Sequence, residues 1–429
     1  MFRRLATVLS NKKVMVRVAI TLALLLVFRF VSHIPIPLFN SSAISDAINQ
    51  EGSFFAIINN FTGGALGRFS VLALGISPYI TASIVMQLLQ MVVPAIKEWA
   101  DQGEEGKQKV NRITRYLAII LAFIQGLALI IGSDRNGSIF VPSIVSPNAF
   151  LYIYMALIVA AGTAFTIWLA DLITKHGVGN GTSLLIAIGI TSAMPAMFTT
   201  LGQTYLGAGT SFGNVMIFVS VVAIYLLILL GVVYLQIATR KIPIQYANRP
   251  SGRGGKSDSN IPIKLNSAGV IPVIFASTIM SIPLTFVQLF NSNMSDSGWL
   301  VQIFSSEKPI GFVIYVFLIV LFSFFYSFMS IDPEKIADNL SKSNAYIKGV
   351  RPGEDTKNYI ARVLFKVTVI GTIYLVVLAI IPIIAVIAGL PSSITLGGTG
   401  LLIIVGVATE TTQQVETDAE QTTYGGIFD

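Results

Sequence analysis

The sequence contains no cysteine and only two histidines, His33 and His176, among 429 residues. The lack of cysteine excludes disulfides, a thiol nucleophile and a thiolate metal site. Two histidines are too few for a zinc or di-iron centre built on imidazole ligands. We therefore expect neither a metal nor a cofactor.

Charge is also scarce. Charged residues make up 11% of the chain, against about 25% in an average soluble domain. Apolar residues reach 54%, and the mean hydropathy is +0.75. A soluble protein of this size could not cover its surface with so few charges, so the composition indicates a polytopic membrane protein. It excludes a disordered chain and an ordinary cytosolic enzyme.

Motifs for catalysis are missing as well. Gly255-Lys256-Ser257 resembles the end of a Walker A motif, but the position of the motif's first glycine is Pro250. The glycine-rich residues 177–181 lack the dinucleotide spacing. We expect no enzyme activity, so a partner or a gradient must supply any energy that the protein uses.

Buried ionisable residues, which ion-coupled transporters usually keep, are few. Arg29 lies within the first apolar run, Asp171 ends the fourth, and Glu410 follows the last. This scarcity argues against a charge-coupled pump. A secondary transporter with broken helices, an intramembrane enzyme and a purely structural scaffold are the alternatives to the channel described below.

Ten apolar runs predict membrane spans, because about 20 apolar residues in a helix cross a bilayer. The predicted spans are Val18–Ser32, Val71–Val93, Tyr116–Gly132, Leu151–Ala170, Ser183–Leu201, Val215–Leu235, Ala268–Leu289, Ile310–Ser330, Val363–Gly389 and Thr395–Val407.

The cationic residues predict the orientation of these spans. Of the 28 Lys and Arg residues, 24 lie in the N-terminal segment and in every second loop. The other loops hold only Arg68, Arg135 and Lys308. Cationic loops stay in the cytoplasm, so we expect both termini to be cytoplasmic.

One apolar segment, Phe54–Leu66, is too short to span and lies in the first external loop. It contains Asn59, Asn60 and the Gly63-Gly64 pair. An interfacial helix on the outer surface is one interpretation. A re-entrant element inside the bundle is the other, because irregular backbone at membrane depth must be buried in protein or line a cavity.

Two cytoplasmic loops, residues 240–265 and 332–362, are longer than connectors require. The first carries six cationic residues against one acidic residue. Such loops set topology and contact anionic lipids. Basic mobile loops can also dock an acidic protein or RNA phosphates.

Several motifs resemble the SecY family, the pore subunits of the bacterial protein-translocation channel. The resemblance covers about residues 1–414, with ten spans in matching order. The matching segments are residues 63–70, 73–84, 87–89, 177–181, 266–277, 337–340, 349–353 and 397–403.

The resemblance implies an all-α membrane protein. Ten helices form two inverted five-helix halves around a central hourglass pore, with a re-entrant plug helix. It divides the chain into a cytoplasmic N-terminal segment (1–17), an N-terminal half (18–205, with the plug at 54–66), a C-terminal half (206–412, with docking loops 240–265 and 332–362) and an acidic tail (413–429).

The same resemblance assigns four groups of residues. The pore ring is Ile76, Ile80, Ile186, Ile190, Ile274 and Ile403; the plug contains Phe55, Ile58, Phe61, Gly63 and Gly64. The lateral gate contains Gln87, Gln125 and Asn266; the docking residues are Arg240, Lys241, Arg249, Arg253, Lys256 and Arg351.

The family's function implies a passive, gated channel in the bacterial plasma membrane. It would pass unfolded secretory proteins, recognise signal peptides and release transmembrane segments laterally into lipid. The implied partners are the small subunits SecE and SecG, the SecA motor ATPase and the ribosome with its rRNA. Anionic lipids are a further expected contact.

The C-terminal tail departs from the family pattern. No Lys or Arg follows Lys366, whereas the end of the chain carries acidic residues, which are Glu410, Glu416, Asp418, Glu420 and Asp429. Contacts between this tail and ribosomal RNA are therefore not expected.

Overall fold

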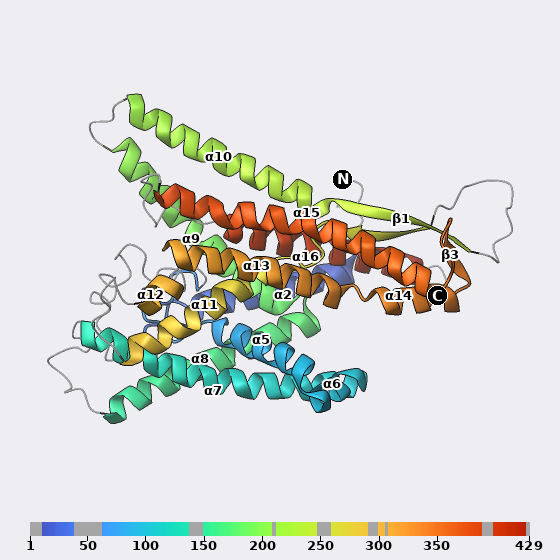
Figure 1. The fold of residues 1–429 in the computed structure, drawn as a ribbon. Coiled ribbons are helices and arrows are strands. Elements are labelled where there is room, and N and C mark those ends of the chain that lie inside the picture. The colour runs from blue at the N-terminus through green and yellow to red at the C-terminus, as the bar shows by residue number, and fades with distance from the viewer. Residues whose placement is uncertain are drawn as a thin grey trace.

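The protein is described from a computed structural model. The structure describes residues 11–37, 62–136, 149–207, 212–246, 259–290, 299–304, 308–387 and 398–425. Most of the long helices run along one direction, and three short strands lie at one end of the bundle (Figure 1).

The first half of the chain forms α2 (Lys12–Val31), α5 (Ser77–Val92), α6 (Pro94–Asp101), α7 (Glu104–Asn136), α8 (Ala149–His176) and α9 (Gly181–Leu206). Side chains that accept a backbone N–H fix two of the helix starts, Asn11 before α2 and Asn180 before α9. Residues 62–76 form turns rather than helix.

The second half forms α10 (Phe212–Ile237), β1 (Thr239–Tyr246), β2 (Ser259–Lys264), α11 (Ile271–Phe290), α12 (Trp299–Phe304), α13 (Pro309–Ser330), α14 (Pro333–Lys342), β3 (Ala345–Ile347), α15 (Glu354–Ile387) and α16 (Gly398–Gly425).

Among the described residues, seven helices are long and apolar enough to cross a membrane: α2, α7, α8, α9, α10, α13 and α15. The other three predicted spans coincide with the helices α5, α11 and α16. The count of ten therefore fits the structure but stays a prediction.

Several helices start or end at residues other than the predicted span boundaries; α7, for example, begins at Glu104 rather than at Tyr116. The second span was placed at Val71, but α5 begins at Ser77, with Pro78 in its first turn, where proline's missing N–H is harmless. The last span was placed up to Val407, but α16 continues to Gly425.

A small sheet is a feature that the all-α prediction missed. Its strands are antiparallel, in the order β2-β1-β3. Strands β1 and β2 come from the first long loop, and β3 comes from the second. Ile242 and Ile347 are buried with Leu340 and Leu364 in one cluster, so the two predicted docking loops form a single packed unit.

Apolar clusters hold each half together. In the first half, Phe69, Ile130 and Met155 pack together, so α7 and α8 close over residues 62–76. In the second half, Val232 of α10 and Leu375 of α15 share a cluster with residues of α11, α13 and α16.

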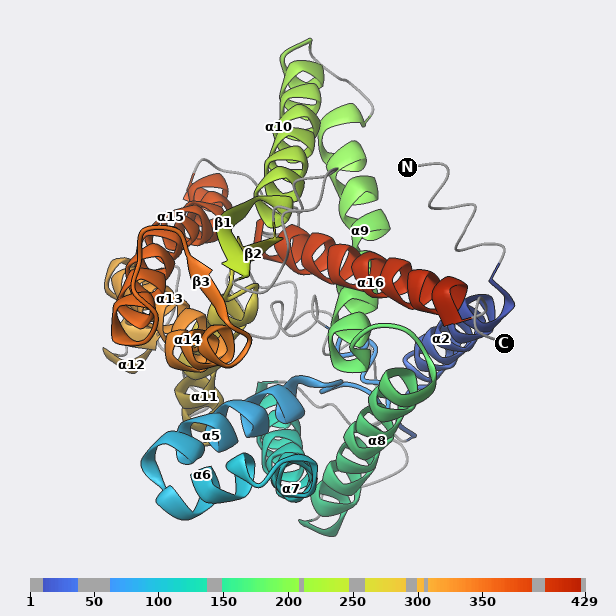
Figure 2. The ribbon, with the colours of Figure 1, turned by 90° about the vertical axis from the view of Figure 1, so that its right-hand side faces the viewer.

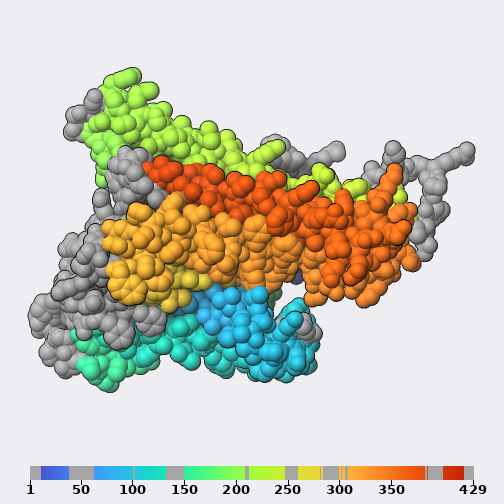
Figure 3. Space-filling view, viewed as in Figure 1, coloured from blue at the N-terminus to red at the C-terminus, as the bar shows by residue number. Residues whose placement is uncertain are grey.

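The outer faces of the long helices are apolar and exposed. On the face shown in Figure 3, α10, α13 and α15 form much of the surface. Leu227 and Leu230 of α10 are 71% and 68% exposed. A surface of this kind is what membrane lipid covers.

Candidate functional site: an apolar constriction and its gate

The two halves meet at one cluster of apolar side chains. It contains all six residues predicted to form a pore ring: Ile76, Ile186, Ile190 and Ile403 are buried, and Ile80 and Ile274 are partly buried. The cluster draws on the start of α5 and on α9 from the first half, and on α11 and α16 from the second half.

Helix geometry explains how α5 and α9 contribute to this cluster. Ile80 lies four residues after Ile76, and Ile190 lies four residues after Ile186. Ile76 is the N-cap of α5 and has a helical backbone conformation, so side chains at this spacing share one helix face in both cases. Each pair therefore presents two branched side chains to the same point.

A small cavity of about 50 Å³ lies within the cluster. Its lining residues are Thr62, Ile76, Ser77, Ile80, Ile186, Ile274, Ser277 and Thr278. This space holds only one or two water molecules. So small a space cannot hold the continuous column of water that hydrated ions need to pass.

Thr62 lines this cavity, and Gly63 follows it in the chain. Thr62 is 4% exposed. Gly63 packs against α9 so closely that a Cβ atom would lie 2.4 Å from Ser192 Oγ and 2.8 Å from the Gly189 carbonyl oxygen. Its φ of +66° is a conformation that L side chains rarely adopt. Only glycine fits this contact.

Two arginines hold the backbone at the same point. Arg29 Nη1 donates to the Gly63 carbonyl oxygen at 2.9 Å, and Arg68 Nη2 reaches it at 3.5 Å. Arg68 Nε also donates to the Gly64 carbonyl oxygen at 3.2 Å. The intramembrane Arg29 is thus satisfied by the C-terminal end of the predicted plug, residues 62–66.

The predicted plug is described only in part. Gly63 and Gly64 lie in turns beside α9. Phe55, Ile58 and Phe61 lie outside the described residues. The choice between an interfacial and a re-entrant segment therefore stays open for residues 54–61.

A second contact between the halves joins α5 to α11 and α13. Ile84 of α5 is buried with Phe275 of α11 and Tyr326 of α13. The rings of Phe275 and Tyr326 meet edge to face, with their centroids 4.9 Å apart. The Tyr326 hydroxyl donates to Gln87 Oε1. We call this contact the α5–α13 seam.

The three predicted gate residues lie in different places. Gln87 is in the seam. Asn266 is buried, and its Nδ2 donates to Gln236 Oε1 at 3.4 Å, so its hydrogen bond stays within the second half. Gln125 is partly buried on α7. Only Gln87 has a described hydrogen bond across the seam.

Three of the predicted docking residues lie on the packed unit of the two docking loops, which we call the cytoplasmic unit after its predicted orientation. Arg240 and Lys241 are exposed on β1, and Arg351 is exposed in the turn between β3 and α15. Thr356 Oγ1 donates to the Arg351 carbonyl oxygen at 2.8 Å and fixes that turn. Arg249, Arg253 and Lys256 lie outside the described residues.

Sequence reasoning missed Tyr326 and the pairing of Arg29 with Gly63. A tyrosine within an apolar run gives no sign of which helix it faces. Arg29 gave a clearer signal, because a charge in a spanning helix needs a partner. Gly63, 34 positions away, could not be chosen from the sequence.

Comparison with known proteins gives consistent results. A sequence profile of the SecY family matches residues 70–412. The protein translocase subunit SecY of Halalkalibacterium halodurans is 43% identical over 436 residues, with complete coverage of both chains. That of Staphylococcus aureus is 44% identical over 437 residues and covers 100% of this chain and 99% of its own.

Solved structures share the fold at lower identity. A structure of a protein-conducting channel superposes with a TM-score of 0.66 at 20% identity, covering 95% of this chain and 93% of its own. The Sec61 channel of a canine ribosome–channel complex gives a TM-score of 0.64 at 21% identity, covering 94% and 92%.

A bundle of apolar helices whose halves meet at a narrow apolar constriction defines the class of α-helical membrane channels. Within that class, the profile match and the full-length identity leave one assignment. The chain belongs to the SecY family.

Proposed function

We propose that this chain is the gated, passive pore subunit of a bacterial protein translocase. Unfolded secretory proteins cross the plasma membrane through it, and transmembrane segments leave it sideways into lipid. The observation that carries the proposal is the apolar cluster that joins six isoleucines from both halves, four of which line a cavity of about 50 Å³.

The physics of the ring suits this function. Branched apolar side chains make no directional bonds, so they can part for a polypeptide of any sequence. When they close, the constriction loses water and blocks ions. A transporter would instead need charged groups or ion ligands at mid-membrane, whereas the lining of this cavity offers four isoleucine side chains and four hydroxyl groups. No chemical step is assigned to this chain.

The proposal is tested by placing a photo-crosslinker at Ile80 and stalling a secretory precursor during export. Ile80 lines the cavity, so we expect crosslinks along the length of the precursor. The matched control is Leu230, which faces outward on α10 and should give none. A precursor that crosses without contacting position 80 would disprove the proposal.

The α5–α13 seam is the proposed lateral gate. Tyr326→Phe removes the hydroxyl that bonds Gln87 but keeps the ring that packs on Phe275. A hydrogen bond between membrane helices contributes about 1 kcal/mol, so we expect roughly fivefold better export of a reporter with a weakened signal peptide.

The control for this variant is Tyr374→Phe. The buried Tyr374 hydroxyl has no hydrogen-bond partner among the described residues. Its removal should leave signal selectivity unchanged. Equal export of the reporter by the Tyr326→Phe variant and the parent would contradict the assignment of the seam as the gate.

The cytoplasmic unit is the proposed docking site for SecA or the ribosome. SecE and SecG are proposed to complete the membrane complex, with both termini cytoplasmic and the basic loops near anionic lipid. Arg351 carries the most specific expectation, because it is exposed on a turn whose backbone is fixed by Thr356.

For Arg351→Glu we expect an intact fold and a loss of SecA-driven transport on the order of tenfold, since a docking contact becomes a repulsion. Transport by purified proteoliposomes measures it. The control is Lys97→Glu on α6, an exposed lysine outside the cytoplasmic unit. Normal SecA-driven transport by the Arg351→Glu variant would refute its docking role.

A further inference from the structure

The acidic end of the chain is not a loose tail. Helix α16 continues without a break for 28 residues, from Gly398 to Gly425. Its first part packs in the second half, where Leu402 shares a cluster with Val232 of α10. Figure 2 shows the C-terminal part of α16 running towards α2, which belongs to the first half.

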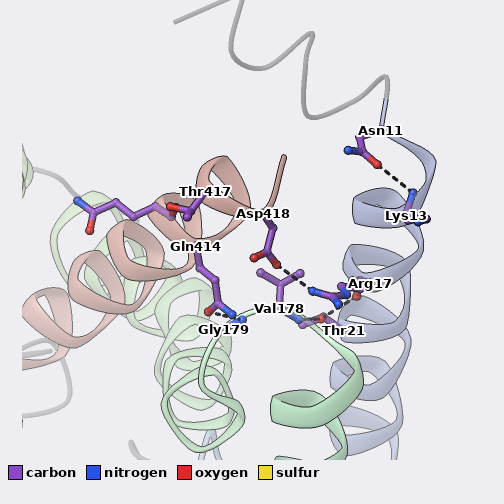
Figure 4. Close-up of polar contacts among 10 residues, drawn as sticks. Asn11, Lys13, Arg17, Thr21, Val178, Gly179, Gln414, Thr417 and Asp418 are labelled. Carbon is purple, nitrogen blue, oxygen red and sulfur yellow. Dashed lines mark hydrogen bonds and ion pairs between the residues drawn. The ribbon is translucent and has the colours of Figure 1, made fainter. Parts of the chain in front are cut away.

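Two polar contacts tie the far end of α16 to the first half. Arg17 Nη1 of α2 donates to Asp418 Oδ2 at 3.0 Å. The backbone N–H of Gly179, in the loop between α8 and α9, donates to Gln414 Oε1 at 3.1 Å. Figure 4 shows both side chains pointing from α16 to these partners.

The loop between α8 and α9 lies in close contact with α16. A Cβ atom on Gly179 would lie 2.9 Å from Thr411 Oγ1, and the φ of Gly179 is +83°. On its other side the loop is fixed to α2, where the Val178 N–H donates to Thr21 Oγ1 at 2.9 Å. The loop is therefore held between α2 and α16, both of which touch it directly.

The same turns of α16 also touch the second half. Lys264 Nζ, at the end of β2, donates to Gln413 Oε1 at 3.5 Å. Gln413 and Gln414 are neighbours in the chain, yet one bonds the second half and the other the first. This stretch of helix spans the boundary between the halves at the cytoplasmic end.

We propose that residues 411–418 of α16 form a strap that holds the two halves in the closed arrangement, with Gln414 and Asp418 as its positioning residues. Separation of the halves lengthens the Asp418–Arg17 and Gln414–Gly179 contacts, and hydrogen bonds weaken steeply with distance. The acidic residue at 418 thereby gains a role that an acidic tail in solvent would not have. Its consequence for transport rests on the proposed channel function.

The test measures the separation of the halves directly. The chain has no cysteine, so spin labels attach only where cysteines are introduced. We place them at Lys109 on α7 and Lys348 after β3, which are both exposed. Pulsed electron resonance on the full chain, in its membrane complex in nanodiscs, reports the distance distribution between the halves.

For Asp418→Asn we expect the population with a long distance between the two labels to grow about threefold, because an exposed ion pair contributes only a small stabilisation. Adding Gln414→Leu should raise the increase to about tenfold. The charge exchange Arg17→Asp with Asp418→Arg should restore the parent distribution. Glu410→Gln, a matched loss of one acid at an exposed position of the same helix, should change nothing.

Unchanged distributions for Asp418→Asn and for the double variant would overturn the strap. An equal effect of Glu410→Gln and Asp418→Asn would also overturn the strap, because the loss of one negative charge anywhere on the helix would then explain the change. Precursor transport by the labelled parent is measured in parallel. Absence of that transport would refute the proposed function, whereas the distance measurements judge the strap alone.

Discussion

Ile186→Ala is expected to make the closed channel leak ions. The side chain is 8% exposed and lines the cavity in the constriction. Truncating a buried isoleucine costs about 2–5 kcal/mol. Ile186 packs against the other ring members in this structure, so we expect the truncation to weaken this arrangement relative to an open one. A closed state weakened by even 2 kcal/mol shifts the open fraction roughly 30-fold.

Ion flux into proteoliposomes without any precursor measures this effect. The control is Ile224→Ala on α10, where the isoleucine is 57% exposed on the outer face. It removes the same atoms far from the constriction, so its leak should match the parent. Parent-like flux for the Ile186→Ala variant would show that these isoleucines do not form the seal.

Gly63→Ala is expected to have a comparably large effect by displacing residues 62–64 from α9. The new methyl group would lie 2.4 Å from Ser192 Oγ and 2.8 Å from the Gly189 carbonyl oxygen. The left-handed backbone adds about 1–2 kcal/mol for any L residue. We expect a persistent ion leak together with lower thermal stability of the closed state.

The matched control is Gly202→Ala, which lies on α9, the helix that Gly63 packs against. A Cβ atom there meets nothing within 4 Å, and alanine favours a helix over glycine by about 1 kcal/mol. That variant should be as stable as the parent or more so. Combining Gly63→Ala with Ser192→Gly should recover part of the seal, because it removes the nearest clash. No recovery and no leak would argue against the close contact at Gly63.

The part of the site that the sequence predicted best rests on helix periodicity. Ile76 with Ile80, and Ile186 with Ile190, are four residues apart, and each pair reaches the same cluster. The spacing shows which residues share a face but not what that face meets. The resemblance to a family supplied the expectation that the four faces converge.

The sheet could not be predicted because its strands contain proline. Pro262 lies in β2, an edge strand, where a missing N–H is tolerated. Pro243 lies in the central strand β1, but β1 pairs with β3 only from Ile244 onwards. In the β1–β2 register Pro243 stands opposite Asn260 and Pro262 stands opposite Lys241, a placement that only the assembled sheet reveals.

The contacts between the halves could not be predicted from the sequence either. Tyr326 pairs with Gln87 across 239 positions, and Arg17 pairs with Asp418 across 401. No local pattern encodes partners at such separations. The end of α16 likewise could not be predicted as a membrane span, because its sequence is polar. It is a helix that contacts the loop between α8 and α9.

The small volume of the constriction has a consequence for the energy that the cell stores across its membrane. A membrane potential stores about 2.3 kcal/mol per elementary charge for each 100 mV. A pore wide enough for a polypeptide would let ions flow and dissipate the membrane potential if it stayed filled with water. A space of about 50 Å³, lined by four isoleucines and four serine or threonine residues, holds too little water to conduct. An idle channel of this kind can remain in an energised membrane without uncoupling respiration from the work that the gradient performs.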